Sequence, residues 1–254
     1  HYWEDTPDMI QVEQWSVEHE TDKAMAFLEK QCNQEAPFAL FLSWNPPHSP
    51  FELVPERYKE LYKEASIAFR QNVEVKDPLL VHTGETIKGG QDRLIQYTKD
   101  YYAAISGLDE QFGRLLDQLE AMGIADDTIV VLTSDHGELL GSHGMMAKHS
   151  WHEESIGVPF LVRWPGQIPA GETDAVLNTV NIMPTLLELL HLPVPDTVEG
   201  TSMHRLLLNP AENHNRYDSH LEQAAYICAF PGRKELLEMF AEAGKNNLSY
   251  GWRG

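Results

Sequence analysis

The sequence predicts an α/β fold in which a mostly parallel or mixed sheet carries helices on both faces. Three short apolar runs, at residues 38–42, 128–133 and 158–162, are typical of strands that are buried on both sides. Segments whose apolar residues have helical spacing lie between these runs. Strands that alternate with helices in this way favour a sheet covered by helices on its two faces.

The first expected elements are a helix and a strand. Thr21 is a candidate N-cap for a helix over residues 22–31, which carries apolar residues at helical spacing. The apolar run 38–42 follows as a strand. It ends in residues 43–50, where three prolines exclude a helix and a central strand because proline lacks a backbone N–H donor. Pro55 then starts a second, short helix.

The clearest helix comes after residues 70–96, which are polar and weakly patterned and are expected to form a loop. Apolar residues then recur in steps of four and three, as they do along one face of a helix, and Gly123 is a natural C-terminal stop. The stripe comprises Tyr101, Ile105, Leu108, Phe112, Leu115, Leu119 and Met122. We expect it to face the sheet, with Leu108, Phe112 and Leu115 among the most buried side chains.

The second half of the chain continues the alternation. Strand 128–133 is rich in β-branched residues, and strand 158–162 follows a loop rich in glycine and histidine. Pro184 starts a leucine-rich helix. A last amphipathic helix, which contains Leu236, is expected to end at Gly244.

Length and charge restrict the classes of protein and partner. The 254 residues suit one α/β domain over residues 1–254. Nineteen basic against 39 acidic residues give a formal net charge of −20, which repels phosphate backbones and anionic lipids, so nucleic acid and membrane surfaces are not expected partners. No apolar run reaches the roughly 18 residues of a membrane span. Cys32 and Cys228 lie outside any C-x-x-C pattern and are expected to be buried free thiols.

Polar groups of an unusual kind follow two of the expected strands. His48 comes after the first, and Asp135 and His136 come directly after strand 128–133. Open α/β sheets bind ligands beyond the carboxyl ends of their strands, so parallel strands would place these groups at one edge. A carboxylate next to an imidazole can bind a divalent cation, and oxygen ligands suit Ca²⁺, Mg²⁺ or Mn²⁺. The alternative is a simple turn in which Asp135 caps backbone N–H groups.

The loop that follows, residues 141–154, holds three histidines, one lysine and two acidic residues. Lys148 could neutralise an anionic group held by the metal. The plain alternatives are a solvated side chain for Lys148 and an ordinary surface or core histidine for His152. We expect Lys148 and His48 to converge with the Asp-His pair at one edge of the sheet.

A series of motifs in a fixed order carries more information than any one of them. The motifs are Pro47-His48-Ser49-Pro50, Thr133-Ser134-Asp135-His136-Gly137-Glu138, Leu140-Gly141-Ser142-His143-Gly144, Lys148, Glu153-Glu154, Val158-Pro159-Phe160, Pro165-Gly166 and Met183-Pro184-Thr185. This order resembles the latter half of a sulfatase, a family of the alkaline phosphatase superfamily. The resemblance covers nearly the whole chain and implies a partial alkaline phosphatase-like sandwich.

The resemblance implies a role for each site residue. Asp135 and His136 would be metal ligands, at positions where the family has Asp followed by Asn or His. His48 and Lys148 would contact the sulfate, and either could help to protonate the leaving oxygen. The metal would be divalent, with Ca²⁺ expected first and Mg²⁺ or Mn²⁺ as alternatives. The implied enzyme is a sulfuric ester hydrolase that releases sulfate from a sulfated carbohydrate or other small molecule. The negative charge that builds up during this reaction is stabilised by a metal and fixed cations.

The sequence departs from the family pattern at the nucleophile. Sulfatases carry an early C-x-P-S-R or S-x-P-S-R segment whose Cys or Ser becomes formylglycine, and an early aspartate pair that completes the metal site. Neither is found here: the residues after Cys32 are Asn33-Gln34-Glu35-Ala36, and those after Cys228 are Ala229-Phe230-Pro231-Gly232, so neither cysteine is followed by the motif. We therefore expect a sulfatase fragment without the nucleophile segment and the C-terminal subdomain, and we expect this chain alone not to turn over sulfate esters.

Two other functions stay open on these grounds. One is a phosphonate or phosphate monoester hydrolase of the same superfamily, in which the Asp-His pair also occurs. The other is a non-catalytic module that keeps the scaffold. A periplasmic or secreted location would suit a parent protein that acts on glycans, and the oligomeric state stays open.

Overall fold

The computed structural model describes residues 11–32, 34–81, 86–173 and 175–209. Its α-helices are α1 (Ser16–Gln31), α2 (Glu56–Lys59), α3 (Gly90–Ala121), α4 (Glu153–Ile156), α5 (Ile182–Leu189) and α6 (His204–Leu208). Its strands are β1 (Leu79–Val81), β2 (Thr86–Ile87), β3 (Val130–Thr133), β4 (Met145–Met146) and β5 (Phe160–Arg163). The predicted helix that ends at Gly244 lies outside the described residues, as does Cys228.

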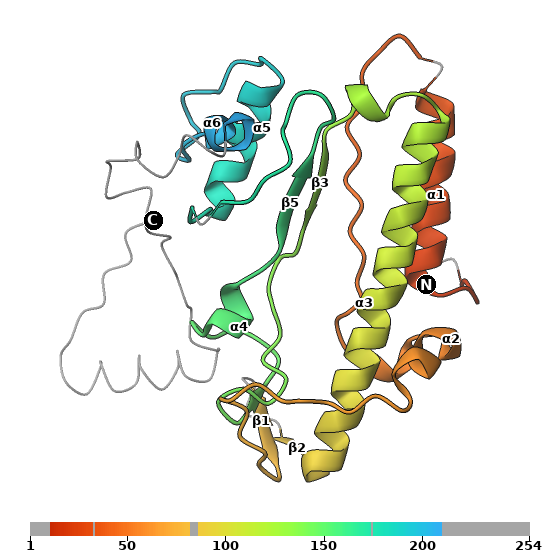
Figure 1. Cartoon of the computed structure of the whole chain (residues 1–254), viewed down its shortest axis with the longest axis vertical. Helices are drawn as coiled ribbons and strands as arrows, with labels where there is room; N and C mark the ends of the chain where they lie inside the picture. The colour runs from red at the N-terminus through yellow and green to blue at the C-terminus, as the bar shows by residue number, and fades with distance from the viewer. Residues whose placement is uncertain (1–10, 33, 82–85, 174, 210–254) are drawn as a thin grey trace, which may run out of the picture.

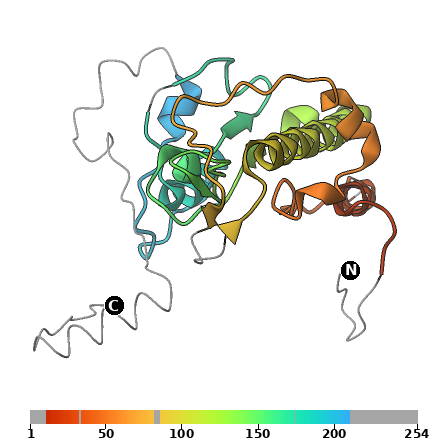
Figure 2. The same cartoon turned by 90° about the horizontal axis from the view of Figure 1, so that it is seen from below.

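The strands form two small sheets. β3 and β5 pair antiparallel, with Val130 opposite Arg163 and Thr133 opposite Phe160. β1 lies between an antiparallel β2 and a parallel β4. Helices α1 and α3 lie on one side of the β3–β5 pair, and α5 and α6 lie on the other (Figure 1 and Figure 2). The α/β class with helices on both faces is therefore confirmed, with a mixed and an antiparallel sheet among the described residues.

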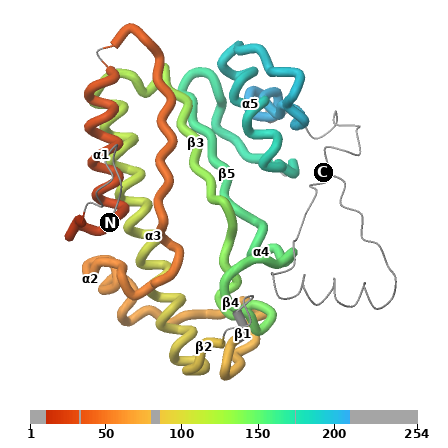
Figure 3. Tube along the Cα trace, turned by 180° about the vertical axis from the view of Figure 1, so that it is seen from behind, coloured from red at the N-terminus to blue at the C-terminus, as the bar shows by residue number. Residues whose placement is uncertain are grey.

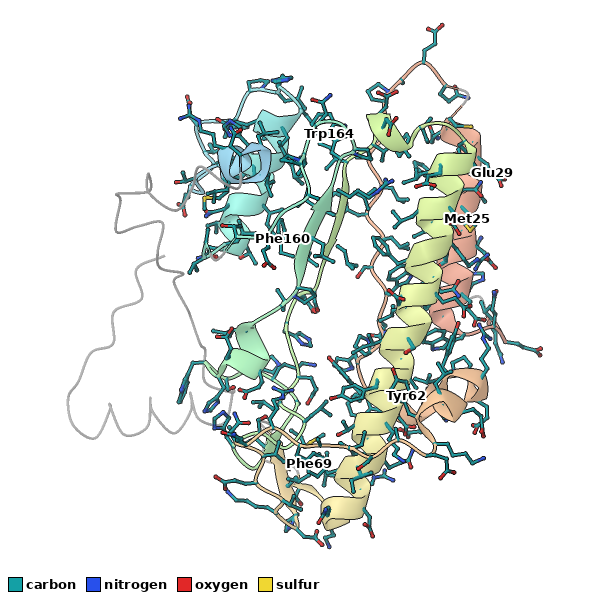
Figure 4. All side chains as sticks on the ribbon, in the orientation of Figure 1. Met25, Glu29, Tyr62, Phe69, Phe160 and Trp164 are labelled. Carbon is teal, nitrogen blue, oxygen red and sulfur yellow. The ribbon has the colours of Figure 1, made fainter. Side chains whose placement is uncertain are left out.

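The long helix α3 packs closely against its neighbours through small residues. Its buried positions include Ala103, Ala104 and Gly107, and a Cβ added to Gly107 would lie 2.6 Å from Cζ3 of Trp15. Between these residues, the hydroxyl of Ser106 lies 2.8 Å from that of Tyr62, and Figure 4 shows the Tyr62 ring beside α3. The small side chains of Ala103, Ala104 and Gly107 let Trp15 and Tyr58 pack close to the backbone of α3, so this face of the helix is buried.

The predicted burial of the apolar stripe is therefore wrong, although the helix itself is confirmed. Leu108, Phe112 and Leu115 are only half-buried, and of the stripe only its C-terminal part, around the buried Leu119, packs against α1. The small-residue face packs against Trp15 and Tyr58 instead. Gly123 has φ +69° and ends the helix as expected. The helix begins at Gly90, so the last part of the predicted loop 70–96 is helical, and part of its remainder forms β1 and β2.

The first helix also begins earlier than the sequence predicts. α1 starts at Ser16, which places Thr21 inside the helix and not at its N-cap. The Thr21 hydroxyl is buried and donates a hydrogen bond of 2.7 Å to the carbonyl oxygen of Val17. This bond within the helix satisfies the hydroxyl that a capping role would have used.

Residues 38–42 are extended but do not form the predicted buried strand. Phe38 packs edge-on against Phe27 of α1, with ring centroids 5.9 Å apart, and joins the cluster that contains Leu119. Phe41 is 95% exposed, and the segment, which passes between α3 and β3 in Figure 3, has no strand partner among the described residues. β5 likewise leaves Leu161 58% exposed, so the expectation that strand 158–162 is buried on both faces is also wrong.

Three further points concern the remaining predictions. Cys32 is only half-buried and not buried as predicted, and its thiol donates a hydrogen bond of 3.3 Å to the carbonyl oxygen of Glu29. Pro184 lies in the first turn of α5, which begins two residues before it, at Ile182. Within the described ranges, no helix combines the length and the apolar character needed to cross a membrane.

Candidate active site

The end of β3 leads into a tight contact with α4. The backbone N–H of Gly137 donates a hydrogen bond of 2.8 Å to the carbonyl oxygen of Ser155. A Cβ at position 137 would lie 2.1 Å from the carbonyl oxygen of Glu154, so only glycine fits there. The close approach of these two backbones positions His136, the residue before Gly137.

The Asp135–His136 pair presents two metal-ligating atoms to the same space. The backbone N–H of His136 donates to Oδ1 of Asp135 (3.0 Å), and the Asp135 side chain is 83% exposed. Nδ1–H of His136 donates to the carbonyl oxygen of Gly137 (2.8 Å), which leaves the lone pair of Nε2 available as a ligand. Oδ2 of Asp135 lies 3.5 Å from this Nε2, a separation that suits two ligands of one divalent cation.

These two residues do not by themselves make a complete metal site. In the portion of the chain that the structure describes, no group of three or more His, Cys, Asp or Glu side chains is arranged to hold a metal ion. The donor set of one carboxylate and one neutral imidazole thus fits a divalent metal, but further ligands are needed to complete its coordination.

His48 and Lys148 lie together although 100 residues separate them. Nδ1–H of His48 donates a hydrogen bond of 2.8 Å to the carbonyl oxygen of Ser49, and the Lys148 ammonium donates to Nε2 of His48. The rings of His48 and His136 are 6.1 Å apart between centroids. The structure thus brings all four predicted site residues together, but not through parallel strands, since β3 pairs antiparallel with β5 and His48 follows an extended segment.

The loop that carries Lys148 is held by a buried carboxylate that the sequence analysis did not single out. Oε1 of Glu138 accepts hydrogen bonds from the backbone N–H groups of Leu140 (3.3 Å) and Ala147 (2.5 Å). Burial raises the pKa of Glu138, and the charge of Lys148 acts in the opposite direction. An acidic residue between a glycine and two leucines is the sequence signal that indicates such a buried position.

The backbone around Lys148 is also unusual. Ala147 and His149 have φ values of +69° and +68°, in the left-handed region that non-glycine residues seldom adopt. Lys148 therefore lies between two sharp bends, one of which is held by Glu138. The Lys148 ammonium therefore lies against His48, whose ring is next to that of His136. An anion bound at Lys148 and a metal bound at Asp135 and His136 would lie side by side.

Comparison with known proteins identifies the family of this chain. A sequence model of the sulfatase family matches residues 2–192. The chain belongs to the sulfatase family. The ulvan-active sulfatase of Formosa agariphila is 32% identical over 91% of this chain, and the endo-4-O-sulfatase of Bacteroides thetaiotaomicron is 31% identical over 82% of it. The chain spans 43% and 41% of the lengths of these two relatives.

Solved structures show the same relationship. The structure of sulfatase YidJ from Bacteroides fragilis superimposes with a TM-score of 0.69, at 35% identity over 78% of this chain and 42% of its own. A phosphonate monoester hydrolase of Agrobacterium radiobacter superimposes with a TM-score of 0.61, at 26% identity over 74% of this chain and 41% of its own. The sulfatases and the phosphonate monoester hydrolase are members of the alkaline phosphatase superfamily. Sulfatases in general use a divalent metal and a formylglycine nucleophile.

Proposed function

We propose that the protein carrying this chain hydrolyses sulfate esters, and that this segment supplies the sulfate-binding cations and part of the metal site. The observation that carries the proposal is the contact between Lys148 and His48 beside the Asp135–His136 pair. A cation and an imidazole placed next to two metal ligands suit an anionic group that must be bound and stabilised as it gains charge.

In this proposal His48 and Lys148 bind the sulfuryl oxygens. The Lys148 ammonium now donates to Nε2 of His48, and a sulfate oxygen offers a stronger, charged acceptor in its place. The hydrogen bond from Nδ1 of His48 to the Ser49 carbonyl keeps the ring oriented, while Nε2, once Lys148 has turned to the sulfate, takes up a proton and donates it in a hydrogen bond to a sulfuryl oxygen. Either side chain can then deliver a proton to the leaving oxygen, Lys148 from its ammonium group and His48 from the protonated Nε2.

The metal would be held by Oδ2 of Asp135 and Nε2 of His136, with the remaining ligands supplied from outside this sequence. When bound, a divalent cation supplies positive charge against the developing negative charge of the sulfuryl group. We propose Ca²⁺ as the first candidate, with Mg²⁺ and Mn²⁺ as alternatives that the imidazole ligand also permits. The nucleophile would be a formylglycine from a segment outside this sequence, because no C-x-P-S-R or S-x-P-S-R motif occurs in residues 1–254.

The substrate class is proposed from chemistry shared with relatives. One solved structure, 25% identical with a TM-score of 0.65 over 77% of this chain, holds D-glucosamine-2-N,6-O-disulfate as its substrate. Together with the ulvan-active and endo-4-O-sulfatases, it supports a sulfated carbohydrate as the substrate. An exported location stays a prediction for the parent protein.

The test compares substitutions at the proposed anion site. Lys148→Ala should weaken binding of inorganic sulfate to the purified chain by about 10- to 150-fold, because hydrogen bonds to charged groups are worth about 1.5–3 kcal/mol. Lys63→Ala is the matched control, since Lys63 is an exposed lysine that forms an ion pair with the nearby Glu60. Equal binding by both variants would refute the role of Lys148.

Activity provides a second, independent readout. The full-length protein should hydrolyse sulfate esters in preference to phosphate and phosphonate esters, and the chain of 254 residues alone should not turn over an aryl sulfate with added Ca²⁺, Mg²⁺ or Mn²⁺. Turnover by the isolated chain that disappears in Asp135→Ala would show that the nucleophile lies within it. A preference for phosphonate esters would favour the other hydrolase class.

A further inference from the structure

The loop that carries Lys148 continues into a stack of three rings, which begins three residues after Lys148. Trp151 is 69% exposed, and its ring stacks on His152 with centroids 5.6 Å apart and planes 25° apart. His152 in turn stacks on His143, at 3.9 Å and 24°. The outer face of this stack is a large flat aromatic surface.

The base of the stack is held by a network of hydrogen bonds. Nε2 of His143 lies 3.3 Å from Oε2 of Glu154. Oε1 of the same carboxylate accepts a hydrogen bond from the side-chain amide of Asn72. The Arg70 guanidinium lies 3.7 Å from the same carboxylate. Nδ1 of His152 lies 3.0 Å from Oγ of Ser150, which limits rotation of the middle ring. A surface that is already ordered loses little side-chain entropy when a ligand binds to it.

Backbone contacts place this surface close to the anion site. Trp151 follows Lys148 by three residues, so their Cα atoms are at most about 11 Å apart. The segment just after Trp151 is held against β3 by the hydrogen bond from Gly137 to Ser155, next to the metal ligand His136. The exposed indole is thus carried by the short segment that joins Lys148 to the residues held next to His136, and this connection is the basis for placing it near a sulfate bound at Lys148.

The character of the surface indicates what kind of group it suits. The face of an aromatic ring carries negative potential and attracts polarised C–H bonds, which one face of a pyranose ring presents as a flat patch. Trp151 is flanked in sequence by Ser150 and His152, polar residues that can bond to ring hydroxyls. Purely apolar ligands instead favour enclosed apolar pockets, which an exposed indole with polar neighbours does not provide.

We propose that Trp151 is the stacking platform for the pyranose ring of the sulfated substrate and so selects saccharide sulfates over other sulfate esters. This inference rests on the proposed sulfatase function. Trp151 is a specificity-determining residue in it, and Lys148 and His48 retain the sulfate.

The test uses the full-length protein that carries this chain, with Trp151→Ala, Trp151→Phe and Lys148→Ala. The substrates are a panel of sulfated hexosamines and sulfated deoxyhexoses, with nitrophenyl sulfate as the ester without a sugar. Trp151→Ala should raise KM for the sugar sulfates about tenfold and leave kcat and the inhibition constant of inorganic sulfate within about twofold. Trp151→Phe keeps an aromatic face and should recover most of the loss.

Three other results would contradict either the role of Trp151 or the sulfatase function. An equal rise in KM for sugar and nitrophenyl sulfates in Trp151→Ala would show that the indole shapes the loop and does not recognise a sugar, which overturns the inference. Cleavage of nitrophenyl sulfate with no sugar sulfate cleaved would also overturn it. Full activity of Lys148→Ala would instead refute the proposed function itself, so the two failures are distinguishable.

Discussion

Two glycines on α3 provide a direct test of how this helix packs. Gly107 and Gly113 both lie well inside Gly90–Ala121, so replacing either with alanine should gain up to about 1 kcal/mol of helix propensity. Their surroundings differ. A Cβ at Gly113 would meet no atom within 4 Å, whereas a Cβ at Gly107 would lie 2.6 Å and 2.7 Å from two ring atoms of Trp15 and 2.9 Å from Cε2 of Tyr58.

The two contributions at Gly107 have opposite signs, and the steric one should be larger. Forcing an extra methyl group into a well-packed site costs about 1–3 kcal/mol, and both neighbours here are rigid aromatic rings. Gly107→Ala should therefore lower the free energy of unfolding by roughly 1–2 kcal/mol. Gly113→Ala should raise it by up to about 1 kcal/mol.

Urea denaturation of the purified protein measures both effects. The midpoints of the two variants should move in opposite directions, and the slope m should stay unchanged because the folded state keeps its compactness. Gly113→Ala is the control for helix propensity, since the same residue change is made in the same helix. A similar increase in the midpoint for both variants would refute the close packing of Trp15 and Tyr58 on α3.

Three further predictions follow from single contacts. The hydrogen bond from Asn72 lowers the pKa of Glu154 to about 2, so ionised Glu154 stabilises the fold above about pH 4.5, and this stabilisation is lost as the pH falls toward 2. In Glu154→Gln, the urea midpoint should vary less than that of the unmodified protein over this pH range, and parallel curves would exclude the contribution. Leu94→Ala should cost about 2–5 kcal/mol in thermal or urea unfolding because Leu94 is fully buried, whereas Leu115→Ala, at a half-buried position, should cost less. Gly137→Ala should destabilise the protein and abolish sulfate binding, because its Cβ would lie 2.1 Å from a carbonyl oxygen of α4, and a variant with normal binding would show that this contact does not position the site.

The sequence by itself determined the local features of this protein. The spacing of apolar residues predicted α3, and Gly123 predicted its end, because helical period and left-handed backbone depend on residues that are close in the chain. The order of motifs predicted the sulfatase family and identified Asp135, His136, His48 and Lys148 as candidates for its site.

Tertiary structure decided which faces are buried and which side chains meet. Ala103, Ala104 and Gly107 are buried while Leu108 and Phe112 of the same helix are only half-buried, because Trp15 and Tyr58 from other segments pack against the small residues. Residues 38–42 have the composition of a buried strand, yet burial needs a paired neighbour that composition does not supply. The stack of Trp151 on His152 and His143, and the contact of Lys148 with His48, depend on how distant segments pack together. No local pattern encodes such contacts, because the energy that forms them belongs to both segments and not to either one alone.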